Sequence, residues 1–146
     1  MPSEMMEGGQ YSAFIERALR DQRSKLREST LGHQESLEEL ACVWEACRHP
    51  DWDGYGALAV EPQTLRTAYM LIDSLPLGFL RPSIGAEPDG QLTLEWRRSP
   101  RRVLSVSVDP DGLLHYAGLF GNNKRFGTLT FFSTPPDELL QLVRDL

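Results

Sequence analysis

The chain changes character at seven residues near its middle, Asp51-Trp52-Asp53-Gly54-Tyr55-Gly56-Ala57. Before this central loop, apolar residues recur at steps of three and four, the spacing of one face of an α-helix. From residue 83 onward, apolar and polar residues alternate, which is the spacing of a β-strand with one buried face. Two glycines beside a tyrosine allow positive φ, and Asp-Gly is typical of a turn. The central loop therefore separates a helical half from a strand-rich half.

The central loop has two interpretations. In the first it is a structural connector, in which the aromatic side chains pack on the core, the glycines make the bend and the aspartates cap it. In the second it is a binding loop, because loops on a rigid scaffold often carry function. Its candidate binding residues are Asp51, Trp52, Asp53 and Tyr55.

Helical periodicity predicts four helices, over residues 11–29, 34–48, 62–75 and 135–146. The second is expected to end before Pro50, and the third to begin at Pro62, a residue suited to a first helical turn. The first two would form a helical hairpin that covers the sheet or meets another subunit.

Alternation with a period of two predicts five strands, over residues 83–87, 91–97, 102–108, 113–119 and 126–132. Turn residues separate them at intervals of about ten, which is typical of an antiparallel meander. We therefore predict an α+β fold: N-terminal helices, then a five-stranded antiparallel sheet with helices on one face, and a short C-terminal helix. The other face would be polar, with Thr93, Glu95, Arg97, Ser105 and Ser107 pointing outward.

The central loop also carries a resemblance. Trp52 to Ala57, followed by a helix, by Glu87-Pro88-Asp89-Gly90 and by Glu95-Trp96, resembles a family of small uncharacterised bacterial proteins with a W-D-G-x-G-A motif and an EPDG/EW β-hairpin. The resemblance covers residues 50–146 and implies a domain boundary but no activity. We expect a flexible N-terminus at residues 1–10, a helical hairpin at 11–49 and an α+β domain at 50–146, the last two forming one compact unit.

Composition excludes several classes of protein. With 40% apolar and 25% charged residues, the chain has the makeup of a globular protein. It has no apolar run long enough to span a membrane and no signal-peptide pattern at its start, so we expect a cytoplasmic location. Cys42 and Cys47 lie five residues apart, on different faces of a predicted helix, so we expect free thiols.

Charge is unevenly distributed. The net charge is −6, and residues 31–60 hold six acidic residues against one arginine. Residues 97–102 instead hold four arginines and no acid: Arg97, Arg98, Arg101 and Arg102. An arginine-rich turn can clamp a phosphate or carboxylate, and it can also simply keep a hairpin tip soluble. Because the whole chain is acidic, nucleic acid is not the expected partner.

Catalytic motifs are not evident. His115 stands in a predicted strand without a nucleophile motif around it, and Asp109-Pro110-Asp111-Gly112 has the composition of an ordinary turn. The segment around Gly54 and Gly56 lacks the Lys and the Ser/Thr of a phosphate-binding loop. We predict no catalytic residues, no metal ligands and no cofactor, and the sequence favours a protein that is not an enzyme.

Three functions follow as hypotheses. The first is a non-enzymatic protein-binding module of the bacterial cytoplasm, whose partner is another protein, as for an antitoxin or inhibitor; this role is an analogy. A homodimer through residues 11–48 is a further expectation. The alternative is a metal-assisted hydrolase that uses Asp53 with Glu87 or Glu95. The third is anion or nucleic-acid binding at the Arg97–Arg102 turn.

Overall fold

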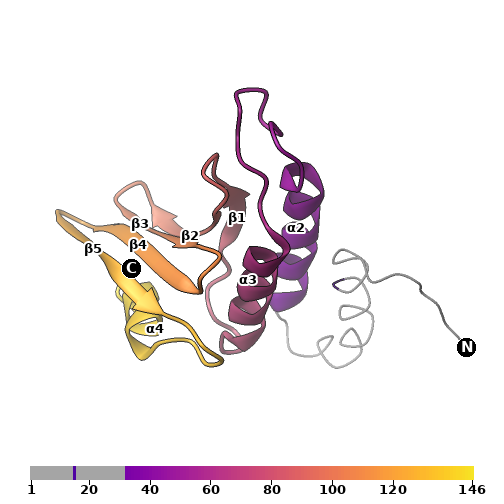
Figure 1. Ribbon diagram of the computed structural model, residues 1–146. Helices are drawn as coiled ribbons and strands as arrows, with labels where there is room; N and C mark the ends of the chain where they lie inside the picture. The colour runs from indigo at the N-terminus through magenta and orange to yellow at the C-terminus, as the bar shows by residue number, and fades with distance from the viewer. Residues whose placement is uncertain (1–14, 16–31) are drawn as a thin grey trace, which may run out of the picture.

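The computed structural model describes residues 15 and 32–146 (Figure 1). These residues form three helices and one sheet: α2 (Gly32–Cys47), α3 (Pro62–Ser74), β1 (Ser83–Ala86), β2 (Leu92–Ser99), β3 (Arg102–Val108), β4 (Leu113–Phe120), β5 (Asn123–Thr130) and α4 (Asp137–Arg144). The predicted α+β fold is confirmed. Except for residue 15, the helix predicted over residues 11–29 lies outside the described residues, and so does that part of the proposed dimer segment 11–48.

The sheet is an antiparallel meander in which each strand pairs with its neighbours in the chain, in the order β1-β2-β3-β4-β5. Pairing of β4 with β5 runs without interruption from Leu113↔Thr130 to Phe120↔Asn123. Pairing of β2 with β3 contains one irregularity, between Arg97 and Ser99. Five strands in sequence order therefore leave β1 and β5 at the two edges.

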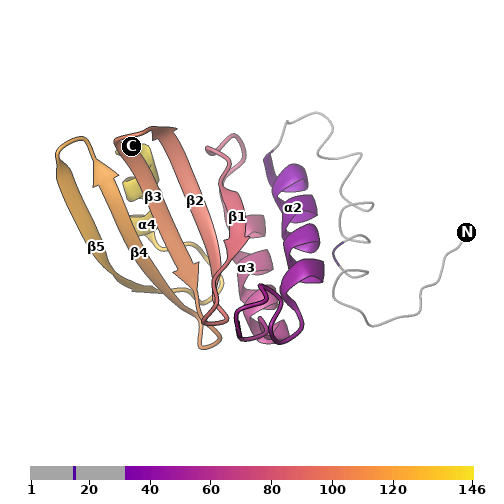
Figure 2. The same ribbon diagram turned by 90° about the horizontal axis from the view of Figure 1, so that it is seen from above.

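Helices cover one face of the sheet. Figure 2 shows the sheet face-on, with α3 and α4 behind it and α2 beside β1. The covered face contributes the fully buried side chains of Leu92, Leu94, Trp96, Leu104, Val106, Val108 and Leu114. No described element covers the opposite face, which we call the open face. The predicted outward residues of β2 and β3 lie on it.

The helices bury the positions that their periodicity predicts. In α2, Leu37, Leu40, Trp44 and Cys47 are buried and belong to the same core as the sheet residues. Pro62 lies in the first turn of α3, where a missing backbone N–H has no cost. Burial raises the pKa of the Cys47 thiol to about 11, so this residue is an inert core side chain. Cys42 and Cys47 are both free, as predicted.

Some predicted boundaries were wrong, most clearly the starts of the fifth strand and of the closing helix. The fifth strand was expected over 126–132 but spans Asn123–Thr130, because Gly121 with a φ of 74° and Asn122 make a two-residue turn and pairing begins directly after it. The closing helix was expected to start at Pro135, yet α4 begins at Asp137, with Pro136 as its extended N-cap residue. Within the described residues, no helix is both long and apolar enough to cross a membrane.

Candidate binding surface on the open face of the sheet

Three cross-strand rows build the open face. In the first row, Arg97 of β2, Val103 of β3, Leu119 of β4 and Lys124 of β5 stand side by side. The second row contains Glu95, Ser105, Ala117 and Phe126, and the third contains Thr93, Ser107, His115 and Thr128. Side chains on one face of neighbouring strands are close enough to act together. The first row thus places two apolar residues between two cations.

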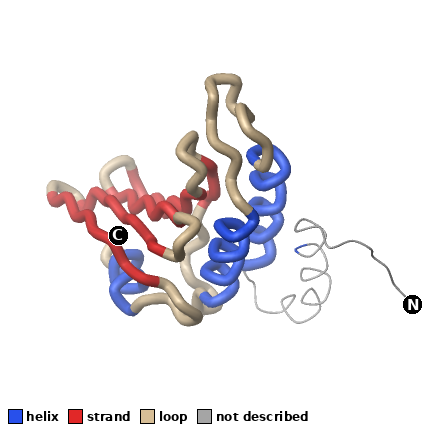
Figure 3. The backbone as a smooth tube through the Cα atoms, in the orientation of Figure 1, coloured by secondary structure: helices blue, strands red, loops and turns tan. Residues whose placement is uncertain are grey.

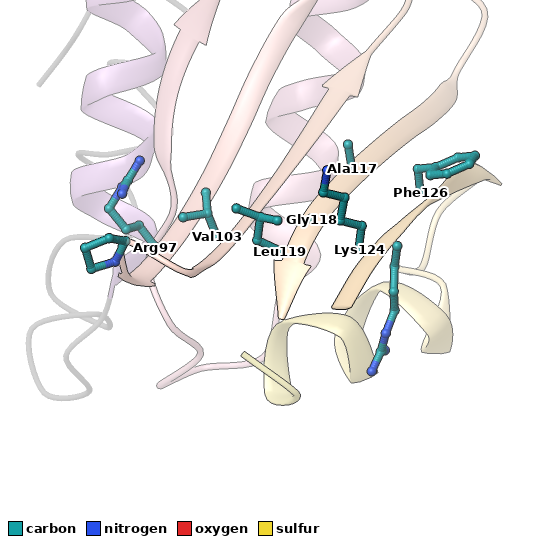
Figure 4. Close-up of a pocket in the computed structure, with 9 residues that line it drawn as sticks. Arg97, Val103, Ala117, Gly118, Leu119, Lys124 and Phe126 are labelled. Atoms are coloured by element: carbon teal, nitrogen blue, oxygen red, sulfur yellow. The ribbon is translucent and has the colours of Figure 1, made fainter. Parts of the chain in front are cut away.

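The first row, together with Ala117 and Phe126 of the second, lines a shallow hollow of about 380 Å³ (Figure 4). Its apolar lining includes Val103, Leu119 and Phe126, and its cationic lining includes Arg97 and Lys124. The side chain of Phe126 is 80% exposed, although large aromatic side chains are usually well buried. An apolar hollow rimmed by cations on an uncovered sheet face is the kind of surface that a partner fills.

The arginine turn lies beside a second basic turn. Arg101 donates from Nη1 to Asn122 Oδ1 at 2.8 Å, and its carbonyl oxygen accepts the Gly121 N–H at 2.9 Å. The β2–β3 turn and the β4–β5 turn are therefore joined. Lys124 and Arg125 lie at the start of β5, just after the second of these turns. The predicted cluster of four arginines does not act as one group, because Arg97 pairs with Glu95 at 3.3 Å and Arg102 donates to the Asp145 carbonyl oxygen at 3.2 Å.

A polar network crosses the third row, and sequence reasoning missed it. A carboxylate oxygen of Glu87 accepts hydrogen bonds from the Thr93 hydroxyl and, at 2.5 Å, from the Ser107 hydroxyl. His115 Nε2 lies 2.9 Å from Asp109 Oδ2. The other ring nitrogen, Nδ1, lies 3.2 Å from the hydroxyl oxygen of Thr128. The register Ser107↔His115 could have signalled this network, but only once the strand pairing was known.

Asp109 anchors this network in the β3–β4 turn. Its Oδ1 accepts backbone N–H bonds from Asp111 at 2.8 Å and Leu113 at 3.0 Å. Burial acts to raise the pKa of Asp109, but the hydrogen bond from His115, the backbone hydrogen bonds and the His115 charge outweigh it and lower the pKa. Asp109 thus carries its charge at neutral pH and fixes the orientation of the His115 ring.

The central loop is held by its own aspartates. Asp51 Oδ1 accepts the Gly56 N–H at 2.6 Å, and Asp53 Oδ1 accepts the N–H groups of Tyr55 at 2.8 Å and Ala57 at 3.1 Å. The backbone closes the loop as well, because Asp51 N–H donates to the Ala57 carbonyl oxygen at 2.7 Å. Asp51 adopts a φ of 61°, a conformation that aspartate tolerates better than most residues. Both carboxylates therefore cap backbone N–H groups of the loop and stabilise its conformation.

The two aromatic residues of the loop differ. Trp52 is partly buried against the core and donates from Nε1 to the Leu58 carbonyl oxygen at 2.9 Å. Tyr55 is 92% exposed at the tip. Figure 3 shows the connector between α2 and α3 projecting past the ends of both helices. Leu58 N–H bonds the Pro88 carbonyl oxygen at 2.8 Å, which ties the connector to the β1–β2 turn. Tyr55 is therefore the exposed aromatic side chain of this loop.

The carboxylates of the hydrolase hypothesis are engaged separately. Asp53 caps the central loop, Glu87 accepts the hydroxyls of Thr93 and Ser107, and Glu95 pairs with Arg97. Across residues 15 and 32–146, no group of three or more His, Cys, Asp or Glu side chains is placed to hold a metal ion. The described structure therefore offers this hypothesis no support.

Comparisons with known proteins give no relatives. No protein-family model matches the chain, and no curated protein or solved structure matches it. The resemblance of residues 50–146 to the W-D-G-x-G-A family stays a prediction, and function has to be argued from the geometry of the site.

Proposed function

We propose that the protein is a non-enzymatic protein-binding module that receives its partner on the open face of the sheet. One observation carries the proposal: an 80% exposed Phe126 beside a row of two apolar residues between Arg97 and Lys124, with no described element covering them. Interfaces are typically built around an aromatic anchor with arginine near it. By analogy with antitoxins and inhibitors, we expect this protein to neutralise its partner in the bacterial cytoplasm.

Site-specific photo-cross-linking tests this proposal. p-Benzoylphenylalanine is placed at position 126 in cells of the native host, and cross-linked proteins are identified by mass spectrometry. The matched control is position 77, because Leu77 is also an exposed apolar residue, 61% exposed, but lies outside the sheet. We expect one protein to be cross-linked from position 126 and not from position 77. The same products from both positions would refute the open face as the docking surface.

A third cross-linking position separates the open face from the central loop. Position 55 reports on the loop directly, because the Tyr55 side chain is 92% exposed and makes no cap. An Asp51→Ala/Asp53→Ala variant is a poorer probe, since it also removes the bonds that hold the loop. If the partner is cross-linked from position 55 and not from position 126, the partner binds the central loop, and the proposal that it binds the open face is wrong.

The joined basic turns favour a second candidate, the binding of an anionic polymer. Arg98 makes no ion pair with any residue in the described part of the chain, and it lies near the end of β2, just before the turn that is bonded to Asn122 through Arg101. Retention on heparin that falls with rising salt, and that Arg98→Ala with Arg101→Ala abolishes, would support it. Equal retention of the double variant would exclude this turn.

A further inference from the structure

The outer edge of β5 is built like an acceptor for another strand. β5 ends the sheet, and no described strand pairs with its far side. Its eight residues, Asn-Lys-Arg-Phe-Gly-Thr-Leu-Thr, contain neither proline nor an acidic residue. Proline, bulges and short length are devices by which proteins close an exposed edge. β5 has none of these three, its charged residues Lys124 and Arg125 lie only at its start, and its pairing with β4 has no irregularity.

The register identifies the free backbone groups. Just after β5, Phe131 N–H donates to the Gly112 carbonyl oxygen at 3.2 Å, so backbone groups of odd-numbered residues point toward β4. Because this direction alternates along an antiparallel strand, the N–H and C=O groups of Lys124, Phe126, Thr128 and Thr130 point away from the sheet. The side chains of these same four residues stand on the open face.

Charge selects the partner for this edge. Lys124 begins the row of free groups and makes no ion pair with any residue that the structure describes. Arg98, near the end of β2, and Arg101, in the joined turn, add positive charge at the same end of the sheet. Arg125 is different, because Asp145 Oδ2 neutralises it at 3.1 Å on the helix-covered side. An incoming strand with a carboxylate beside Lys124 would complement this end.

We propose that an extended, acidic segment of another protein adds to the sheet as a sixth strand alongside β5. Backbone bonds to the four even-numbered residues provide affinity, and alternate side chains of the segment fall beside Lys124, Phe126 and Thr128. An apolar side chain next to Phe126 would cover its exposed ring. This inference rests on the proposed function, because it names the chemistry and conformation of the partner at the same surface.

A pair of variants at position 128 isolates the backbone contact. Thr128→Pro removes an N–H that points away from β4, and an edge strand accepts proline on that side. Thr128→Val keeps the N–H and the branched shape but loses the hydroxyl near His115. Circular dichroism checks that both variants fold. If Thr128→Pro does not fold, Thr130→Pro tests the same edge at its last paired residue.

The probe is a phage-displayed library of random ten-residue peptides, selected on the wild-type protein. We expect selected peptides to alternate apolar residues and to carry Asp or Glu. Their Kd should rise more than about tenfold on Thr128→Pro and stay within about twofold on Thr128→Val, because backbone hydrogen bonds are lost only in the first. Amide exchange measured by NMR should slow at Lys124, Phe126 and Thr128 when peptide binds. Equal binding to Thr128→Pro, or a selection without acidic peptides, would overturn the proposal.

Other occupants of the edge give different results. A dimer in sedimentation that Thr128→Pro dissolves would mean that a second copy fills the edge, which overturns the proposal. Binding of oligo(dT) that slows no β5 amide, with no peptide selected, would assign the surface to nucleic acid and overturn it too. If Thr128→Pro leaves cross-linking from position 126 unchanged, strand addition is rejected. The proposal that a partner binds the open face would still stand.

Discussion

The two edges of the sheet are finished in opposite ways. β1 is four residues long, α2 lies beside it, and Ile84 N–H is bonded by Glu39 Oε2 at 2.9 Å (Figure 2). Arg81 in turn bonds Glu39 and Glu35 at 3.3 and 3.4 Å. β5 is twice as long, has no proline and meets no described element on its far side. Since an unprotected edge is an aggregation hazard that proteins usually close, the open one is where a partner is expected.

The largest expected effect is at the closed edge. Leu40 is fully buried in α2, and Leu40→Ala should lower the free energy of unfolding by about 3 kcal/mol, through lost burial and the cavity left behind. Leu77→Ala is the control, because Leu77 is 61% exposed and its loss should cost less than about 0.5 kcal/mol. Urea denaturation measures both. A loss at Leu40 no larger than at Leu77 would mean that α2 contributes little to closing this edge.

A smaller loss is expected at the cap of β1. Glu39→Ala should cost about 1.5–3 kcal/mol, because the partly buried Ile84 N–H loses a charge-assisted bond and Arg81 loses a partner. Glu39→Gln keeps an acceptor and should cost less. Hydrogen exchange followed by NMR should show the Ile84 amide exchanging faster in Glu39→Ala. Unchanged exchange at Ile84 would show that the carboxylate is not what protects this edge.

Most of the fold was predictable, because its signals are local. Alternation placed β3 at residues 102–108 without error, and a first-turn proline placed the start of α3 at Pro62. The start of β5 was predicted wrongly, because Asn123, Lys124 and Arg125 have no apolar alternation. They are paired only because Gly121 and Asn122 turn the chain tightly. Where tertiary pairing rather than side-chain pattern decides a strand end, periodicity gives no signal.

The candidate site was less predictable, because it depends on register. Arg97 was singled out from its sequence cluster, whereas Val103, Leu119 and Lys124 join it only through three strand pairings. Phe126 was assigned to a strand, but alternation alone does not tell which face lacks a covering helix. The cap by Glu39 links residues 45 positions apart, and no local pattern indicates such a contact. Sequence thus identified the charged turn and the outward polar residues of β2 and β3, but not the apolar hollow beside them.

The smallest expected effect is on stability at the open edge, β5, and it depends on pH through Asp109. Asp109→Asn keeps neutral acceptors for the turn but removes the charge that bonds His115, whose ring meets Thr128 of β5. Because the folded-state pKa of Asp109 is lowered, its charge stabilises the fold above the unfolded pKa of about 4, and this contribution is lost as pH falls through the folded pKa.

At pH 7 we therefore expect Asp109→Asn to lower the free energy of unfolding by about 1 kcal/mol, the difference between a charged and a neutral hydrogen bond. The gap to wild type should close as pH falls through the lowered folded-state pKa of Asp109. Asp111→Asn is the control, because that carboxylate lies exposed in the same turn and has no side-chain hydrogen bond among the described contacts. Urea denaturation from pH 2 to 7 measures the difference. A constant gap across this range would mean that Asp109 acts through packing and not through its charge. If the difference in unfolding free energy closes at low pH, and the β5 amides of Asp109→Asn exchange faster than those of wild type at pH 7, the charge of Asp109 supports the open edge. This edge would then be held by a polar contact from β4 rather than by a covering helix.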